Sequence, residues 1–331
     1  MRCTWKRGVW VLVLVLAPCV WTDSTTDASP GTEQSTTHEI VPIHPGDRLV
    51  FQAGVGSIEV LPTGGEQFVI DTVVKGRGSE AAGNRKLKVT RAQSLVKVPA
   101  DFDRELSGSP QTHAGIEYHL QIPQSSSISL STQDGNITVS GLAAGVEAVT
   151  SRGDLLVSGG SGRTEGDTRR GSIILSHLSG DANLRTKSGS IKLEAVSGKV
   201  KAETGRGNIV VAGLRGDLRA WTGSGDLDLS GVRGPVIAST RAGSIRAATE
   251  DQLGGPWRLE TPGGDIDIAL RSPATITAMA PSGSVSTDLD VATDGPTGGG
   301  TLQGTILGGG PTLRLRALNG SIHIVRSKRS L

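Results

Sequence analysis

Hydrophobic and polar side chains alternate along short runs of this chain, and the runs recur at a fixed interval. Residues 189–242 divide into three rows of 18 residues, and a glycine opens each row. In the first of these rows, Ile191 and Leu193 belong to one alternating run, and Val200 and Ala202 belong to another. Alternation of this kind is typical of a β-strand with one buried face. Each row therefore predicts two short strands joined by two turns, where glycine supplies positive φ angles.

The glycine that opens each row recurs through most of the chain. Steps of 18 residues lead from Gly135 to Gly243, and the next steps, to Gly264 and Gly283, are 21 and 19 residues long. A fixed period of about 20 residues is typical of a solenoid, in which each repeat forms a layer on its neighbour. We therefore predict an all-β fold, a parallel β-solenoid or β-helix of 18-residue coils, over residues 123–326. An irregular β-rich N-terminal cap, residues 39–122, is expected to be continuous with it and to cover its first edge.

Stacked rows place like positions in columns, and the outward columns test this prediction. Opposite charges on neighbouring strands attract by roughly 0.2–1 kcal/mol per pair, so charged columns should alternate in sign. Three columns alternate, and a fourth does not, because Glu147 falls over Glu165 and Lys201 falls over Arg219. The alternating columns are Arg163, Asp181, Lys199 and Asp217; Asp167, Arg185 and Glu203; and Asp228, Arg246 and Asp267.

Two further columns are expected inside the stack. Ile173, Ile191 and Ile209 should form one continuous internal column if the rows are physical layers. Threonine recurs three residues before the opening glycines, from Thr132 to Thr261, and its branched side chain suits a strand. We expect the threonine hydroxyls to bond along their column in a structural role.

The first residues have the layout of a secretory signal peptide, which we assign to residues 1–22. Three basic residues, at positions 2, 6 and 7, precede an apolar run over residues 9–16. That run is too short to span a bilayer comfortably. A Ser/Thr-rich tether, residues 23–38, is expected to follow. The leader implies an exported protein of the periplasm, the cell envelope or the extracellular space.

Cys19 is a candidate lipidation site. Residues 16–19, Leu-Ala-Pro-Cys, resemble a bacterial lipoprotein box, in which the cysteine becomes the lipid-modified N-terminus. Pro18 departs from the small residue expected before that cysteine, so cleavage without a lipid anchor stays open. A lipidated Cys19 would tether the chain to a membrane. Cys3 and Cys19 are the only cysteines, so the chain beyond the leader forms no disulfide.

Composition and charge narrow the choice of partner. Aromatic residues make up 3% of the chain and glycine numbers 47, which suits a thin interior of small aliphatic side chains between many turns. The formal net charge is +2, but residues 1–22 contain three basic residues and no acidic one. The remainder has 31 Lys and Arg against 32 Asp and Glu, so no nucleic-acid partner is expected.

A short motif, glycine followed by Ser, Asp or Asn and then Ile or Leu, accompanies the repeat. Together with the approach Tyr118–Pro123 and the closing residues Asn319–Ile322, it resembles the bacterial putative-adhesin family over roughly residues 40–325. Proteins of that family are exported β-solenoids, similar to the head domains of some auto-transporter adhesins. The resemblance implies a surface or envelope location, and it assigns no catalytic residues. The motif occupies residues 56–58, 135–137, 153–155, 189–191, 207–209, 225–227 and 264–266.

Few residues have the spacing of a catalytic or ligating set. The sequence contains no Walker loop, GxGxxG, HExxH, CxxC or GxSxG pattern, so we assign neither a cofactor nor a catalytic residue. Residues 159–165 are similar to a calcium-binding nonapeptide, but Thr164 stands where Asp is needed and no second copy occurs. Four histidines also lack the spacing of a ligand set, and no metal is expected. They are His38, His44, His113 and His119.

Four aspartates raise the question of an enzyme, because some β-helix proteins cleave polysaccharides with grouped acids. Paired carboxylates act as acid and base at separations of about 5–10 Å. Here Arg246 falls between Asp228 and Asp267, which favours a structural charge ladder. Asp226 and Asp265 occupy a turn position that is Ser or Asn in other rows, which favours capping of backbone N–H groups.

Trp221 and Arg219 are the candidate ligand-binding residues. Trp221 occupies an outward position that is Val, Asp, Arg, Glu or Ser in other rows. An exposed tryptophan can stack on a sugar or anchor a protein partner, and Arg219 is expected on the same face. The alternative is a single exposed aromatic side chain without a binding role.

These features favour a non-catalytic exported surface or envelope protein, an adhesin or interaction scaffold. Its partner would be an envelope or surface component, either a glycan or a protein. Two alternatives stay open, a polysaccharide-active β-helix enzyme and an envelope-stress or signalling accessory protein.

Overall fold

The computed structural model describes residues 34–44, 46–75, 87–100, 115–249, 252–295 and 298–327. Within these ranges the chain forms two β-sheets and no helix, so they hold no helix of the length and hydropathy needed to cross a bilayer. The all-β prediction is confirmed. The predicted signal peptide, Cys19 and His113 lie outside the described residues.

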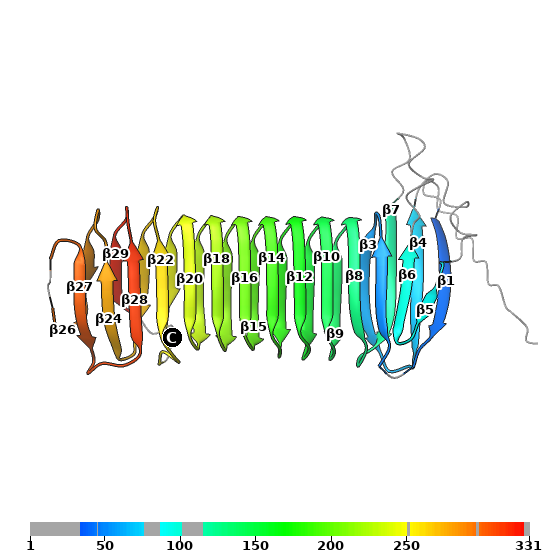
Figure 1. Cartoon of the computed structure of the whole chain (residues 1–331), viewed down its shortest axis with the longest axis horizontal. Helices are drawn as coiled ribbons and strands as arrows, with labels where there is room; N and C mark the ends of the chain where they lie inside the picture. The colour runs from blue at the N-terminus through cyan, green and yellow to red at the C-terminus, as the bar shows by residue number, and fades with distance from the viewer. Residues whose placement is uncertain are drawn as a thin grey trace, which may run out of the picture. The chain divides into compact units, whose positions relative to one another are not determined.

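Sheet A contains 14 strands and sheet B contains 15. Within each sheet the strands lie side by side along the stack (Figure 1). In spatial order, sheet A consists of β1 (Gln34–Pro42), β4 (Gln67–Lys75), β7 (Gly115–Pro123), β3 (Ser57–Thr63), β9 (Ile137–Leu142), β11 (Leu155–Gly160), β13 (Ile173–Leu178), β15 (Ile191–Ser197), β17 (Ile209–Arg215), β19 (Leu227–Arg233), β21 (Ile245–Ala248), β23 (Ile266–Leu270), β29 (Ile322–Arg326) and β25 (Val285–Thr287). In spatial order, sheet B consists of β26 (Val291–Thr293), β27 (Thr301–Ile306), β24 (Ala274–Met279), β28 (Thr312–Ala317), β22 (Trp257–Thr261), β20 (Val236–Ala242), β18 (Leu218–Ser224), β16 (Val200–Arg206), β14 (Ala182–Ser188), β12 (Thr164–Arg170), β10 (Val146–Arg152), β8 (Ser127–Asp134), β2 (Arg48–Ala53), β6 (Leu95–Ala100) and β5 (Thr90–Ala92).

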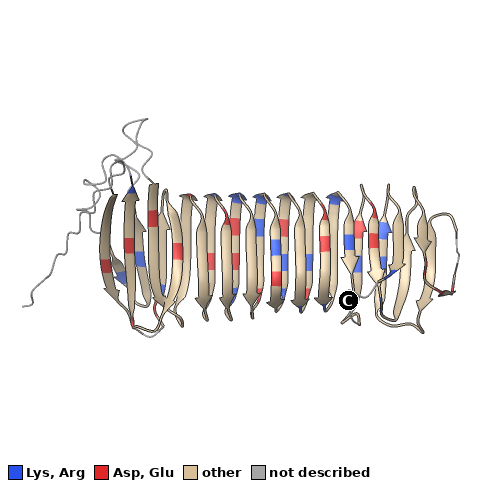
Figure 2. Cartoon of the chain, turned by 180° about the vertical axis from the view of Figure 1, so that it is seen from behind, with Lys and Arg blue, Asp and Glu red and all other residues tan. Residues whose placement is uncertain are grey.

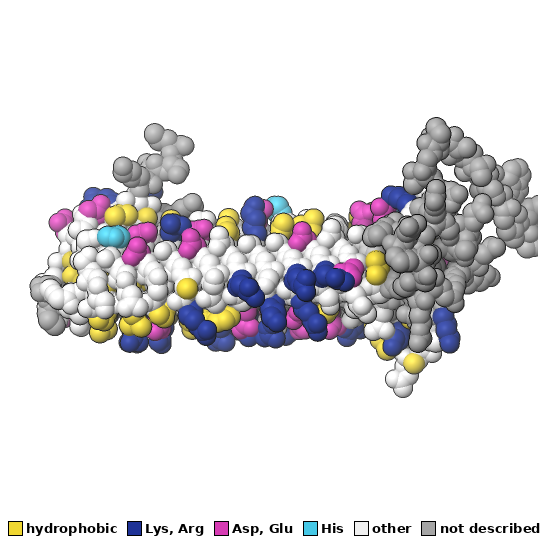
Figure 3. Space-filling view, turned by 90° about the horizontal axis from the view of Figure 1, so that it is seen from above, with side chains coloured by type: hydrophobic (Ala, Val, Ile, Leu, Met, Phe, Trp, Pro, Cys, Tyr) yellow, Lys and Arg dark blue, Asp and Glu magenta, His cyan; other side chains and the backbone are white. Residues whose placement is uncertain are grey.

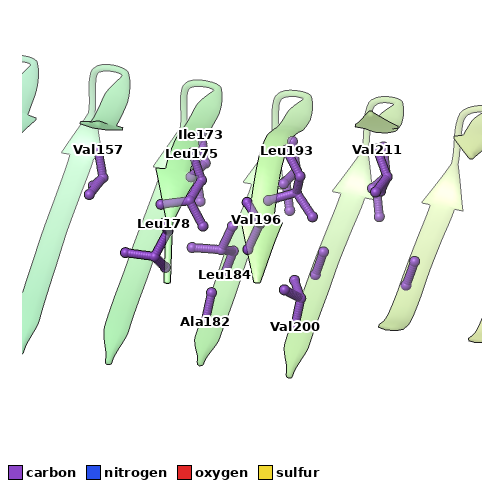
Figure 4. Packing of buried hydrophobic residues seen from close by; sticks show 14 of the residues in the cluster. Val157, Ile173, Leu175, Leu178, Ala182, Leu184, Leu193, Val196, Val200 and Val211 are labelled. Atoms are coloured by element: carbon purple, nitrogen blue, oxygen red, sulfur yellow. The ribbon is translucent and has the colours of Figure 1, made fainter. Parts of the chain in front are cut away.

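Regular coils fill the middle of the stack, from β8 to β22. Each coil contributes one strand to sheet B and one to sheet A, and neighbouring coils pair in parallel. Ile173 pairs with Ile191, Ile191 pairs with Ile209, and all three side chains are fully buried. Apolar side chains from both sheets fill the space between them (Figure 4). The predicted solenoid of 18-residue coils, with two short strands in each, is therefore confirmed.

The opening glycines make the tightest contacts between coils. Gly189 has a φ of +151°, in a backbone region that side chains disfavour. A Cβ atom on Gly189 would lie 2.0 Å from the carbonyl oxygen of Gly171, and one on Gly207 would lie 2.2 Å from that of Gly189. Only a residue without a side chain therefore allows the coils to stack at the inter-strand spacing of about 4.8 Å.

The buried threonines bind these same glycines. The Thr204 hydroxyl donates a hydrogen bond of 2.8 Å to the carbonyl oxygen of Gly189, and Thr222 donates one of 2.9 Å to that of Gly207. The expectation that the hydroxyls bond one another is wrong, because the turn carbonyl is a nearer acceptor. The bond recurs at Thr132, Thr150, Thr168, Thr186, Thr204, Thr222, Thr240 and Thr261.

The polar residue after each glycine caps the next coil. The Asn208 side chain accepts the backbone N–H of Asp226 at 2.9 Å, and Asp226 in turn accepts that of Ser244 at 2.8 Å. Asp265 accepts the backbone N–H of Ser321 at 2.8 Å. The predicted capping role of Asp226 and Asp265 is confirmed.

Antiparallel strands close the N-terminal end of the stack. The strands β2 and β3 already form a coil, because they pair in parallel with β8 and β9. Beyond them, β4 pairs antiparallel with β7 and with β1, and β5 pairs antiparallel with β6. The strand β1 begins at Gln34, so residues 34–38, which were expected to be tether, are strand.

At the C-terminal end, the spatial order of the coils differs from their order in the sequence. The last coil in sequence, β28 and β29, stacks directly on β22 and β23, and β24 and β25 stack outside it. A Cβ on Gly320 would lie 2.1 Å from the carbonyl oxygen of Gly264, and one on Gly283 would lie 2.2 Å from that of Gly320. The predicted step from Gly264 straight to Gly283 is therefore wrong in space. The outer side of β24 is occupied by the antiparallel strand β27, so the final coil pairs with its inner side.

A pair of alanine substitutions separates backbone strain from the contact between coils. Gly213 has a φ of +75°, but a Cβ there would meet no atom closer than 3.8 Å. We expect Gly213→Ala to cost about 1–2 kcal/mol of stability through its backbone angle. Gly189→Ala should cost several times more, because it also forces two coils apart. The thermal midpoint, followed by circular dichroism, measures both variants, and equal losses would contradict the close-contact explanation.

Candidate functional site

Trp221 lies on the outer face of sheet B, in the middle of the stack. It is 40% exposed and stands in register between Glu203 on β16 and Ser239 on β20. The end of its ring, atom Cη2, lies 3.5 Å from the position that a Cβ on Gly223 would occupy. The indole therefore extends along its own strand toward the turn edge, where the glycines follow one another. Arg219, two residues earlier, is exposed on the same face and has no hydrogen-bond or ion-pair partner among the described residues.

Two glycines leave a stretch of backbone without side chains beside the ring of Trp221, and we call this stretch the notch. Gly205 and Gly223 occupy the same column at the ends of β16 and β18. A Cβ on either would lie 2.6 Å from a carbonyl oxygen of the preceding coil, so neither position accommodates a side chain. The same column holds Lys187 on one side of the notch and Arg241 on the other. The aromatic ring is thus flanked by two cations across a gap without side chains.

Cationic side chains continue along this edge of the stack. Seen from above, Lys and Arg side chains line one side of the row of turns (Figure 3). Lys and Arg positions also lie near the upper ends of several strands (Figure 2). Arg152 at this edge pairs with Asp134. Five other cationic side chains are exposed and have no hydrogen-bond or ion-pair partner within the described part of the chain. We call this set the cationic edge; its members are Arg169, Arg170, Lys187, Arg206 and Arg241.

The sequence analysis missed the cationic edge because it followed the charged columns in mid-strand. The signal was present in the rows of 18, in the two columns after each threonine. One of these columns holds Arg169, Lys187 and Arg241, with Gly205 and Gly223 between the last two. The outward neighbours of Trp221 were considered, but the empty positions beside it were not.

Several mid-strand charges are paired, though not always as predicted. In the predicted column of Asp167, Arg185 and Glu203, an ion pair of 3.0 Å joins Arg185 to Glu203. Glu203 also contacts Lys201, its neighbour along the strand, at 2.7 Å. The hydrogen bond from Lys201 lowers the pKa of Glu203, partial burial opposes this shift, and Arg185 lowers the pKa further.

The carboxylates in the column of like charges pair with residues outside that column. Glu165 contacts Arg163, the residue before β12, at 2.8 Å, and Glu147 on β10 pairs with Arg48 on β2. Asp181 caps the backbone N–H of Lys199 at 2.9 Å. Among the described residues, the predicted column of Arg163, Asp181 and Lys199 is therefore not a ladder of ion pairs.

The aspartates considered for catalysis lie on the outer face of sheet A. Asp228, Arg246 and Asp267 are in register on consecutive strands, and Arg246 lies 3.8 Å from Asp228 and 3.5 Å from Asp226. An open cavity of about 350 Å³ is lined by all three registered residues and by the apolar side chains of Val210 and Val325. Among the described residues Arg246 pairs with Asp226 and Asp228 but not with Asp267, so only the first step of the predicted ladder is an ion pair.

A second open cavity, of about 450 Å³, follows the opposite turn edge. Ala195, Gly213 and Gly231 form part of its floor and have φ values of 51°, 75° and 61°. Each is left out of the pairing at the same position of its strand, and the register resumes unchanged after it. The lining combines small residues with polar and charged ones, among them Arg215, Arg233 and Gln252, and we assign it no ligand.

The histidines pair with separate carboxylates. His119 contacts Glu59 at 2.8 Å, and His44 lies 3.6 Å from Asp47. His38 contacts Asp71. Thr164, in the nonapeptide-like segment, is buried between the sheets. The described residues contain no group of three or more His, Cys, Asp or Glu side chains placed to hold a metal ion.

Comparison with known families identifies the repeat. Residues 57–324 match the family described as Toastrack DUF4097, a domain of unknown function. The chain belongs to the Toastrack family. The predicted family resemblance and the predicted solenoid are confirmed by this match. No curated protein sequence matches the chain.

Three solved structures align with this Toastrack chain at low similarity. A putative adhesin from Bacteroides fragilis is 13% identical, with a TM-score of 0.35, over 90% of this chain and 98% of its own. A putative cell adhesion protein from Clostridium sporogenes is 11% identical, with a TM-score of 0.24, over 88% and 100%. A putative lipid binding protein from Parabacteroides distasonis is 13% identical, with a TM-score of 0.37, over 88% and 97%. Similarity at this level carries no functional assignment to this chain.

Acid should weaken the stack around Glu203. Because Lys201 and Arg185 lower the folded-state pKa of Glu203, its ionised form contributes stability above the unfolded-state value of 4.5. That contribution is lost as the pH falls through the lower, folded value. The side chain is partly exposed, so we expect the loss to be below about 1 kcal/mol. Thermal midpoints measured from about pH 6 to pH 3 should fall less steeply in Glu203→Gln than in the wild type. Parallel profiles would contradict this assignment.

Proposed function

We propose that this Toastrack protein is a non-catalytic, exported surface or envelope protein that acts as an adhesin-like binding scaffold. Its partner is a glycan or protein component of the envelope or surface. The observation that carries the proposal is the exposed indole of Trp221 on the outer face of sheet B, beside Arg219. Tryptophan and arginine are enriched among the residues that dominate binding energies.

The stack supports this role physically. Each coil is held to the next by backbone ladders, capping side chains and the glycine contacts, so outward side chains have fixed mutual positions. A surface that is already ordered loses little conformational entropy when it binds. Such a scaffold favours recognition of an extended or repetitive partner over closure around a small molecule.

Export is proposed from the sequence alone. The basic and apolar pattern of residues 1–22 is that of a signal peptide, and the lipoprotein-like box makes Cys19 a candidate for a lipid anchor. The Ser- and Thr-rich residues that follow would then separate the coil stack from the membrane.

Val149 provides a matched control for the role of Trp221. The two residues occupy the same outward column, on β10 and β18, and are 41% and 40% exposed. In a binding screen against envelope glycans and surface proteins, we expect Trp221→Ala to weaken the interaction at least tenfold. Val149→Ala should leave it within twofold. Unchanged binding by Trp221→Ala, with its thermal midpoint preserved, would remove Trp221 from the binding surface.

The cavity beside Asp228 and Asp267 supports one alternative, a polysaccharide-active enzyme. Under the scaffold proposal, the chain should show no turnover of acidic or neutral polysaccharides, measured as new reducing ends. Asp228→Asn and Asp267→Asn should then behave like the wild type in the same assay. Turnover that either substitution abolishes would replace the scaffold proposal with the enzyme.

A further inference from the structure

We propose that the notch beside Trp221 and the cationic edge around it bind an anionic polysaccharide that lies across several coils. This inference rests on the proposed function and names the chemical class of its ligand. Three features carry it: cations without counter-charges, an aromatic ring between them, and a gap without side chains.

The side chains of these cations have no partner within the described part of the chain, unlike three cations in mid-strand. Arg185, Lys201 and Arg246 each contact a carboxylate, whereas Lys187, Arg206 and the other members of the cationic edge contact none. Exposed like charges so close together repel one another, and a bound polyanion relieves that repulsion. The edge therefore has the charge of an anion-binding surface although the chain as a whole is nearly neutral.

The spacing of the cations favours a polymer over a single small anion. Lys187 and Arg241 are three coils apart in one column, which corresponds to about 14 Å at the inter-strand spacing. Arg206 lies at the end of β16, next to Gly205, between these two coils. A single carboxylate or phosphate cannot contact both ends of this set. A chain of acidic sugars presents its charges at intervals of one or two rings, so it can contact both.

Trp221 and the glycine notch fit the neutral part of such a chain. The ring reaches Gly223, and the carbonyl oxygens of Lys187 and Gly205 lie 2.6 Å from where side chains at Gly205 and Gly223 would begin. Gly205 and Gly223 are half-exposed, so backbone and no side chain meets solvent beside the aromatic ring. A sugar ring can place its apolar face on the indole and its hydroxyls toward these backbone groups.

The composition of the turns argues against a membrane as the partner. The residues that follow the opening glycines along this edge are Asn, Asp and Ser, including Ser190, Asn208 and Ser244. Binding at a membrane interface draws on buried apolar area as well as charge, and the turns supply none. Duplex DNA carries one charge per about 1.7 Å of its axis, far denser than one cation per coil.

The test uses the full chain with polygalacturonate and heparin as anionic probes and methyl-esterified polygalacturonate as the neutral match. Titration calorimetry at low salt should detect binding of at least one anionic probe. The ester should bind at least tenfold more weakly, and rising salt should weaken the anionic complex. Binding of neither anionic probe, or equal binding of the ester, would overturn the inference.

Paired substitutions place the site. Lys187→Ser with Arg241→Ser should weaken binding at least tenfold, and Trp221→Ala alone should do the same. The control, Arg215→Ser with Arg314→Ser, removes the same charge from exposed positions away from this edge and should change binding less than threefold. Equal losses in the two double variants would show general attraction to a charged surface and overturn the assigned site.

Two further results separate this inference from the proposed function. Binding to vesicles of anionic phospholipid that is as tight as binding to the polysaccharide, and lost with Lys187 and Arg241, would replace the polysaccharide with a membrane. Trp221-dependent binding to a neutral glycan or a protein, without binding of either anionic probe, would overturn the inference and leave the scaffold function standing. If no tested ligand shows binding that depends on Trp221, both the inference and the proposed scaffold function are overturned.

Discussion

The contact between successive turn glycines is the constraint on which the structure depends. At this contact the Cα of one glycine lies against the carbonyl oxygen of the glycine one coil earlier, and no Cβ fits between them. The same oxygen accepts a hydrogen bond from the hydroxyl of a buried threonine, so both the interior of the stack and the neighbouring coil hold the turn in place. Because every regular coil repeats this arrangement, the coils share one length and one register. The alternating apolar side chains then need only fill the space between two sheets whose spacing is already set.

Because the register is fixed, outward side chains at the same position of successive coils form columns on the surface. An outward residue has neighbours 18 positions away on the adjacent coils and two positions away on its own strand. A charged side chain can pair with either kind of neighbour. Glu203 contacts Arg185 on the neighbouring coil and Lys201 on its own. Where a column lacks a partner of opposite charge, as at Lys187 and Arg241, the positive charge is left facing outward. A binding site in such a stack is therefore formed by residues of one column on several coils. Glycines such as Gly205 and Gly223 can belong to it, because they leave room between side chains.

The 18-residue repeat was enough to predict the coils of the stack. It did not predict the strand order at the ends or the arrangement of residues around Trp221. Ile173, Ile191 and Ile209 could be placed in one column because strand periodicity and the 18-residue step agree. The acceptor of each threonine hydroxyl could not, because it depends on where a backbone carbonyl points. The order of the last coils could not either, since Gly283 and Gly320 both carry the signature of a stacking turn. Trp221 was recognised as an outward aromatic residue, but its relation to Gly223 follows only from its side-chain direction.

The insertion of the last coil gives the chain an unusual ending. The strands β28 and β29 lie between the coil of β22 and β23 and the coil of β24 and β25, so they form ladders on both sides. A solenoid that simply added layers in sequence order could settle coil by coil from its first residue. This one reaches its final order only after residues 312–326 have entered a place between two segments made earlier. Residues 312–326 therefore link the outer strands β24 and β25 to the rest of the stack, and without them these strands would lose their parallel partners.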